Sequence, residues 1–333
     1  MQSDTTLTGS GCPKRMVHGP CGGVRPDLGC EVVAMPCVFA DAEHVPAVTV
    51  VRAVAPAALP LVLTDLSVPA ADAALLARTA RRLAPSCDAL LVGDHQDRPD
   101  FPPSMLARMI ADAGGRPWVT LACRDRNRLV LEAELRGLRH DGLAVVLCVT
   151  GDGRAFDVRS DVTQVFDLEG TRLAGLAASL GLPVAVAETP TAPPVRLRPE
   201  RLVRKQQAGA AVAVLNHVRS AADVDTFLAA ARALGLTIPV IASVAVYTDE
   251  RSAAVLTALP GLEIEPTTVA AVLAAPDPVA AGVEVAVAEA EALLAVPGVV
   301  GVNLSGLASA RGPAYAADVQ AEIGVRIRDR MLR

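Results

Sequence analysis

Several short apolar runs in this chain of 333 residues end in an acidic or polar residue, a placement that allows acid–base chemistry. The clearest example is Asp65 in LVLTDLSVP, where the carboxyl follows an apolar run and precedes a proline-bounded turn. A carboxyl in an apolar setting has its ionised form disfavoured, so its pKa rises and it can act as a general acid near neutral pH. We therefore predict that Asp65 is a catalytic acid. A helix cap or a solvated loop position is the alternative for this residue.

Polar residues close the other apolar runs too. They include Asp94 and His95, Thr150 with Gly151 and Asp152, Glu188 and Thr189, Asn216 and His217, and Asn303 with Ser305. In LCVTGDGR, Gly151 lets another group approach the backbone closely, and Asp152 can accept hydrogen bonds from ring N–H groups. The alternative is a tight turn capped by the aspartate.

Four cysteines are grouped near the N-terminus in a segment rich in glycine and proline. They are Cys12, Cys21, Cys30 and Cys37, with the spacing C-x8-C-x8-C-x6-C. Thiolates on short turns can surround Zn²⁺ tetrahedrally or hold an Fe–S cluster. We predict a structural zinc site, with an Fe–S cluster as the alternative and four unrelated reduced thiols as the remaining possibility.

The segment PERLVRKQQ places Arg201, Arg204 and Lys205 at helical spacing. A solvated basic face is the usual explanation of such a run, and binding of phosphate or carboxylate is the alternative. The five histidines show no H-x-x-x-H spacing, so a catalytic zinc of that kind is not expected.

Eight short apolar runs, bounded by turn residues and alternating with helical stretches, must position these side chains. We predict strands at 61–66, 89–94, 117–123, 143–152, 183–189, 210–217, 238–244 and 299–306, and helices that include 70–84, 220–235 and 283–296. A helix-rich insert at about 247–278 precedes the last strand. Continuous apolar strands suit a parallel sheet that is covered on both faces. Eight such units predict an α/β fold, a (β/α)8 barrel of the TIM type, whose chemistry gathers at the carboxyl ends of the strands.

Composition excludes several classes of protein. Hydrophobic residues make up 52% and charged residues 20%, which indicates a globular chain. The formal net charge of −5 argues against nucleic acid as the main partner. Charges interrupt every long apolar stretch, and the start MQSDTTLTGS has no apolar signal segment, so we expect no membrane span and a cytoplasmic location.

The motifs resemble those of methylenetetrahydrofolate reductase. WVTLACRDRNR is similar to the third-strand region of that family, CVTGD to its fourth-strand region, and RLVRKQQAGAAVAVLNH to a lysine-bearing helix followed by the sixth strand. CPKRMVHGPCGG…GCEV resembles a Cys-rich module that accompanies the reductase in some bacteria. The resemblance implies hydride transfer from NAD(P)H, by way of FAD or without a flavin, to 5,10-methylenetetrahydrofolate, which gives 5-methyltetrahydrofolate.

The resemblance also implies roles for particular residues. Asp65 stands where the family has its catalytic glutamate. Asp152 matches a family aspartate that lies beside flavin and pterin, and Asn216 takes the place of a glutamine that binds the pterin. Thr120 and Thr189 stand where the family has a histidine and a tyrosine against the flavin. The implied cofactor-binding set comprises Asp94, His95, Thr120, Thr150, Gly151, Asp152, Thr189, Arg204 and Lys205, and the implied substrate-binding set comprises Asp152, Glu188 and Asn216.

We thus predict a flexible N-terminus at 1–10, a Cys-rich metal-binding module at 11–45 and a barrel at 46–333. The expected activity is that of an oxidoreductase acting on a folate, and a homo-oligomer is one expected form of the protein. Two alternatives remain open. One is a related barrel that serves a different iminium or amine substrate, and the other is a folate-binding scaffold without catalytic activity.

Overall fold

The structure is a computed structural model that describes residues 11–153, 159–258 and 264–331. The predicted N-terminal segment 1–10 lies outside these residues. Eight parallel strands close into one barrel in chain order, so the predicted (β/α)8 architecture is confirmed. The strands are β1 Val62–Asp65, β2 Ala89–Val92, β3 Pro117–Ala122, β4 Val145–Val149, β5 Val184–Glu188, β6 Val212–Leu215, β7 Val240–Val244 and β8 Val299–Leu304. Each overlaps its predicted run.

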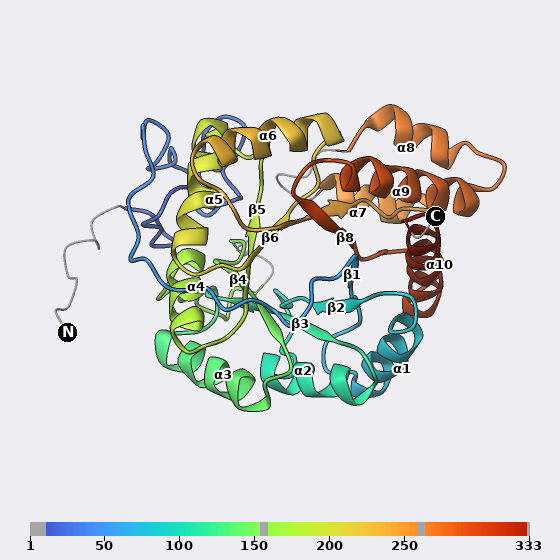
Figure 1. Cartoon of the computed structure of the whole chain (residues 1–333), viewed down its shortest axis with the longest axis horizontal. Coiled ribbons are helices and arrows are strands. Elements are labelled where there is room, and N and C mark those ends of the chain that lie inside the picture. Colours follow the sequence, from blue (N-terminus) through green and yellow to red (C-terminus); the bar gives the residue numbers. More distant parts are fainter. Residues whose placement is uncertain (1–10, 154–158, 259–263, 332–333) are drawn as a thin grey trace.

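Helices surround this barrel on the outside (Figure 1). They are α1 Ala73–Leu83, α2 Pro103–Asp112, α3 Arg128–Asp141, α4 Gly170–Ser179, α5 Arg198–Gln207, α6 Ala221–Ala233, α7 Glu250–Ala258, α8 Pro266–Leu273, α9 Pro278–Leu294 and α10 Pro313–Met331. Helices α7 and α8 form the predicted insert before β8. None of the described helices combines the length and the apolar composition of a transmembrane span.

Local sequence explains where several helices begin and end. The side chains of Asp72, Asn127 and Ser220 each accept a hydrogen bond from a backbone N–H in the first turn of α1, α3 and α6. Such caps satisfy donors that have no partner within the helix. Helix α3 ends at Gly142, whose φ of +64° lies in the left-handed region that glycine adopts without strain.

The core has two layers. Side chains inside the barrel include Leu63, Leu91, Trp118, Leu147 and Val214, and a larger layer fills the space between strands and helices. Because side chains alternate along a strand, the residues two positions after these inner ones also face the interior, where they meet the carboxyl-end mouth of the barrel. This alternation decides which strand-end residues can reach a ligand in the mouth.

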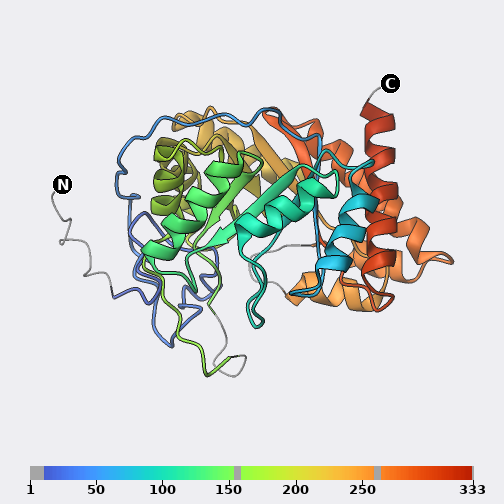
Figure 2. The same ribbon diagram turned by 90° about the horizontal axis from the view of Figure 1, so that it is seen from below.

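The Cys-rich segment is mainly coil, with one isolated β-bridge between Gly29 and Pro36. Its small apolar cluster contains Met16, Phe39 and Val45 and includes Leu197 from the turn before α5. Figure 2 shows this segment beside the loop that follows β4, at one side of the barrel. The N-terminal segment therefore packs against the loops and helices on the β4–β5 side.

Candidate functional site

Asp65 lies where the sequence predicts it, at the carboxyl end of β1. It follows Leu63 by two positions and so faces the barrel interior. Its carboxylate accepts hydrogen bonds from Asn303 Nδ2 at 3.1 Å and from the backbone N–H of Gly306 at 3.2 Å. Burial raises the pKa of Asp65 to about 6, although both hydrogen bonds oppose the rise. The group can therefore carry a proton close to neutral pH.

Asn303 pairs with Leu63 across β8 and β1, and thus also faces the interior. Its Oδ1 atom is buried without a hydrogen-bond partner in the described part of the chain. The sequence placed Asn303 at a strand end but assigned it no role. An unpartnered carbonyl oxygen beside a proton-bearing carboxyl is a suitable acceptor for a polar ligand.

Two hollows open at the carboxyl ends of the strands. A cavity of about 270 Å³ lies at the ends of β4, β5 and β6. It brings together Thr150, Gly151, Asp152, Glu188, Thr189, Lys205 and Asn216 from the predicted set, with Lys14, Cys21 and Gly22 from the Cys-rich segment. A second cavity of about 660 Å³ lies between the loops after β1, β2 and β8, and its lining includes Asp94 and His95. Leu66, the neighbour of Asp65, lines this second cavity.

Within the smaller cavity, Asn216 Nδ2 donates to Thr189 Oγ1 at 2.9 Å. Asp152 is exposed, and its Oδ2 lies 3.5 Å from Gln96 Nε2. Thr150 Oγ1 accepts from the backbone N–H of Gly170 at 2.9 Å, so this hydroxyl caps the start of α4. Asp152 and Asn216 are thus the predicted substrate-binding residues that the structure leaves open to a ligand.

Glu188, predicted to bind substrate, instead anchors a buried ion-pair cluster. Its side chain alternates with the inward-facing Ala187 and therefore points toward α5, where its carboxylate is 0% exposed. Arg201 Nη1 lies 2.8 Å from the carboxylate, Lys205 Nζ 2.9 Å and Arg198 Nη1 3.6 Å. Burial opposes ionisation, but the three cations outweigh it and lower the pKa of Glu188 to about 2. The oxygens of Glu188 are thus already paired within the protein, and substrate binding by this residue stays a prediction.

Basic residues on α5 that were predicted to bind a cofactor also have partners within the protein. Lys205 is buried and also donates to Ala187 O, and burial with the nearby Arg201 lowers its pKa to about 8. Arg204 donates to Glu200 at 2.8 Å and to Val45 O at 3.3 Å, away from the mouth. Both cations therefore have carboxylate partners within the protein, and cofactor binding by either of them stays a prediction.

Asp94 and His95 line the larger cavity with side chains that have partners. Asp94 forms a bidentate ion pair with Arg126, with N–O distances of 2.8 and 3.0 Å. It also accepts a hydrogen bond from the backbone N–H of Ala122. His95 Nε2 lies 3.5 Å from Asp100. Thr120 follows Trp118 by two positions and faces the barrel interior. Of the three carboxyls Asp65, Asp94 and Glu188, only Asp65 has no cationic partner within the described ranges.

The Cys-rich segment contributes residues that sequence reasoning missed. Buried Lys14 donates to Gly151 O at 2.6 Å and forms an ion pair with Glu31. Glu31 in turn accepts from the N–H of Gly153 at 3.1 Å and from Cys21 Sγ at 3.1 Å. These contacts join the segment to the end of β4. No local pattern around Lys14 indicates them, since its acceptor lies 137 residues away.

The four N-terminal cysteines line one narrow apolar cavity. Cys12 and Cys30 are close enough to Cys37 to influence its pKa, which burial raises. In the residues that the structure describes, no three His, Cys, Asp or Glu side chains are arranged to hold a metal ion. Zinc or an Fe–S cluster at these cysteines therefore stays a prediction.

A flavin bound in the predicted way does not fit these residues. Lys205 is committed to Glu188, Arg204 turns away, and Lys14 occupies the backbone oxygen of Gly151. Gly151 has a φ of +90°, and a Cβ there would lie 3.0 Å from Arg124 Cβ. The backbone of Gly151 therefore packs closely against Arg124 and leaves no space for a side chain at this position.

No protein-family model and no curated protein matches this chain. One solved structure of similar fold is an uncharacterized protein from Clostridium thermocellum that is described as binding two copies of 5-methyl-5,6,7,8-tetrahydrofolic acid. Its TM-score is 0.55 at 12% identity, and the match covers 82% of this chain and 96% of that chain. Tryptophan synthase from M. tuberculosis gives a TM-score of 0.46 at 15% identity, covering 83% and 94% of the two chains. Oxaloacetate acetylhydrolase gives 0.44 at 17% identity, covering 81% of each chain. The first of these likenesses agrees with the barrel fold.

Proposed function

We propose that this protein reduces 5,10-methylenetetrahydrofolate to 5-methyltetrahydrofolate with NAD(P)H, by direct hydride transfer and without a resident flavin. The observation that carries the proposal is Asp65, an inward-facing carboxyl with a pKa of about 6 and no cationic partner among the described residues. The similar barrel from Clostridium thermocellum binds 5-methyltetrahydrofolate, which is the product of this reaction.

In the proposed reaction, Asp65 donates its proton to the leaving nitrogen of the five-membered ring that bridges the folate. The carbon–nitrogen bond breaks, and the methylene carbon becomes an iminium on the other nitrogen. Hydride from the nicotinamide then adds to this carbon, which yields the methyl group and NAD(P)⁺. Each turnover consumes one proton, and Asp65 recovers it from solvent because its side chain is only partly buried.

The two hollows at the mouth support a reaction of two substrates. We assign the pterin to the β4–β6 cavity, where Asp152 can accept ring N–H groups and Asn216 can orient the ring. We assign the nicotinamide to the larger cavity beside Leu66. Asp65 and Asn303 face the barrel interior from β1 and β8 and line neither cavity, so in this proposal the folate extends from the β4–β6 cavity to the carboxyl of Asp65.

The test is NAD(P)H consumption by the purified chain in the presence of methylenetetrahydrofolate. Loss of a general acid typically costs 10²- to 10⁴-fold in rate, and Asp65→Asn should lower kcat by about that factor. Asp225→Asn is the matched control, because Asp225 is exposed on α6 and lines neither cavity at the mouth. Full activity of Asp65→Asn would remove this residue from the mechanism. Activity that depends on added FAD would overturn direct transfer.

A second candidate is reduction of a smaller iminium or amine substrate. The β4–β6 cavity of about 270 Å³ is slightly below the range of about 300 to 1,000 Å³ typical of ligand pockets. This candidate predicts NAD(P)H consumption with small cyclic iminium compounds and none with the folate. Turnover of the folate at the higher kcat/KM would exclude it.

A further inference from the structure

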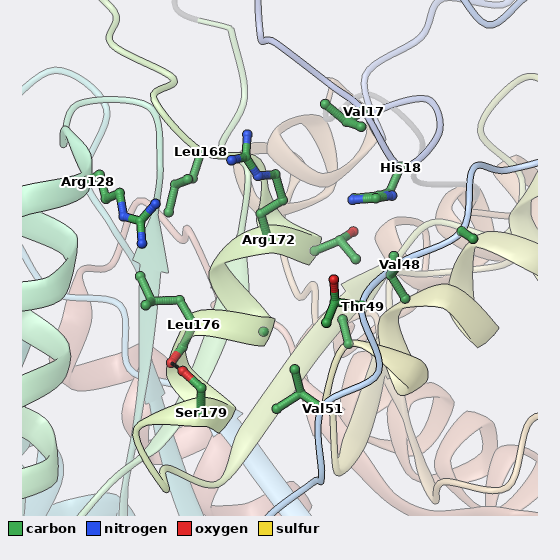
Figure 3. Close-up of a pocket in the computed structure, with 14 residues that line it drawn as sticks. Val17, His18, Val48, Thr49, Val51, Arg128, Leu168, Arg172, Leu176 and Ser179 are labelled. Carbon is green, nitrogen blue, oxygen red and sulfur yellow. Dashed lines mark hydrogen bonds between the residues drawn. The ribbon is translucent and has the colours of Figure 1, made fainter. Parts of the chain in front are cut away.

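A third cavity, outside the barrel mouth, is part of neither proposed subsite. It has a volume of about 460 Å³ and lies between α4 and the N-terminal stretch that runs from Val17 to Val51 (Figure 3). Its size falls within the usual range for small-molecule sites. We call it the α4 cleft.

The α4 cleft has a cationic rim. Figure 3 shows Arg128 and Arg172 on the barrel side of the cleft, with His18 and Thr49 on the side of the N-terminal segment. Arg128 is exposed and pairs with Glu132 at 2.8 Å. Arg172 is exposed on the first turn of α4, and its guanidinium has no hydrogen bond or ion pair with any described residue. Asp167, which accepts from the backbone N–H of Arg128, is itself paired with Arg15 at 3.4 Å.

A second observation points to a ligand. Thr171 is 1% exposed and lines the cleft, yet its Oγ1 has no hydrogen-bond partner in the described residues. Its backbone N–H is satisfied by Glu169 at 3.1 Å, so only the side chain lacks a partner. A buried hydroxyl without a partner is costly, and in native proteins such a group usually meets a water or a ligand.

Apolar side chains line part of the α4 cleft. They belong to Val51, Leu168 and Leu176, and Gly175 adds open backbone, since a Cβ at that position would meet nothing closer than 3.5 Å. Guanidinium groups and apolar side chains in one cleft can together bind an anion that also has an apolar part.

We propose that the α4 cleft is a second binding site, for a small organic anion whose phosphate or carboxylate pairs with Arg172 and Arg128 while its apolar body lies on Val51 and Leu176. The hydroxyl of Thr171 donates to the same ligand. Because the walls come from both the N-terminal segment and the barrel, the bound anion holds the segment against α4.

The experiment is calorimetric titration of the full chain with two probes that share an oxyanion and a flat apolar body. Adenosine monophosphate supplies the phosphate and N-benzoylglutamate the carboxylate, so the stronger binder identifies the anionic group. Arg172→Gln should weaken that binding by about tenfold or more, since it removes a charge-assisted hydrogen bond. Thr171→Val should weaken binding of the probe by a smaller factor, because it removes one hydrogen-bond donor and also removes the cost of an unpartnered hydroxyl in the free protein.

Arg136→Gln is the matched control, because Arg136 is an exposed arginine on α3 that does not line the cleft. Its affinity for the probe should equal that of the natural protein. All of the substituted arginines are exposed, so the variants should fold. Absence of binding by both probes at millimolar concentration would overturn the proposal. Equal affinity in Arg172→Gln would overturn it as well.

Discussion

Replacement of Asp65 by asparagine should stabilise the protein at neutral pH and at the same time lower the rate of the proposed reaction. The carboxyl faces the barrel interior, and burial raises its pKa from the ordinary 3.8 to about 6. A shift of about two units, at about 1.36 kcal/mol each, makes the ionised carboxylate cost about 3 kcal/mol in the folded state. Asparagine does not titrate and avoids this cost.

The stability difference between Asp65→Asn and the natural protein should depend on pH in a defined direction. Below pH 3.8 the carboxyl is protonated in both the folded and the unfolded state, so the natural protein and the variant should have similar stability. Between pH 3.8 and about 6, the unfolded chain loses the proton first, and the natural protein loses stability relative to the variant. Above pH 6 the difference should remain constant.

Asparagine can keep the number of hydrogen bonds at this position unchanged. The new amide oxygen can accept from the N–H of Gly306. The new NH₂ group can donate to Asn303 Oδ1, which now has no partner among the described residues, after Asn303 turns its amide. The site then has two hydrogen bonds, as before, and the NH₂ group of Asn303 takes the position in which its Oδ1 had no partner, so the loss of hydrogen-bond energy is limited.

The assay is urea unfolding of both proteins at several pH values between 4 and 8, with Asp225→Asn as the exposed control. A stability difference between Asp65→Asn and the natural protein that does not change with pH would refute the reasoning, since the carboxyl would then ionise without cost. A loss of stability in the variant at pH 7 would refute it too.

Three further predictions concern the surroundings of the mouth. Glu188→Gln should lower the free energy of unfolding by about 3 to 5 kcal/mol, because three cations lose their counter-charge. In acid unfolding of the natural protein, the stabilisation by ionised Glu188 should decrease as the pH drops from about 4.5 toward 2. Gly151→Ala should lower both stability and kcat, measured by unfolding and by NAD(P)H consumption, because the left-handed backbone and the contact with Arg124 leave no room for a methyl group. Elemental analysis of the purified chain should find one zinc per chain that is lost in Cys37→Ser, and a zinc content unchanged by that substitution would contradict the predicted ligand.

The barrel could be predicted because its signals are local. Each strand is a short apolar run, and each helix carries its own periodicity and often its own cap, such as Asp72 or Ser220. Alternation along β1 likewise places Asp65 on the same face as Leu63, so the mouth position of the candidate acid follows from the order of residues alone. The same alternation along β5 indicates that Glu188 points away from the barrel interior, but the prediction from strand ends did not use this alternation.

What the amino-acid order could not reveal is the choice of partner for each charged group. Lys14 meets Gly151 across 137 residues, and Arg201 and Lys205 neutralise Glu188 instead of facing solvent. These pairings depend on which surfaces the folded barrel brings within hydrogen-bond distance, and no short-range pattern encodes them. The sequence by itself therefore determined the architecture and the position of Asp65. Tertiary packing alone decided which strand-end residues remain free for a ligand, because burial and long-range charge pairing exist only once the chain is folded.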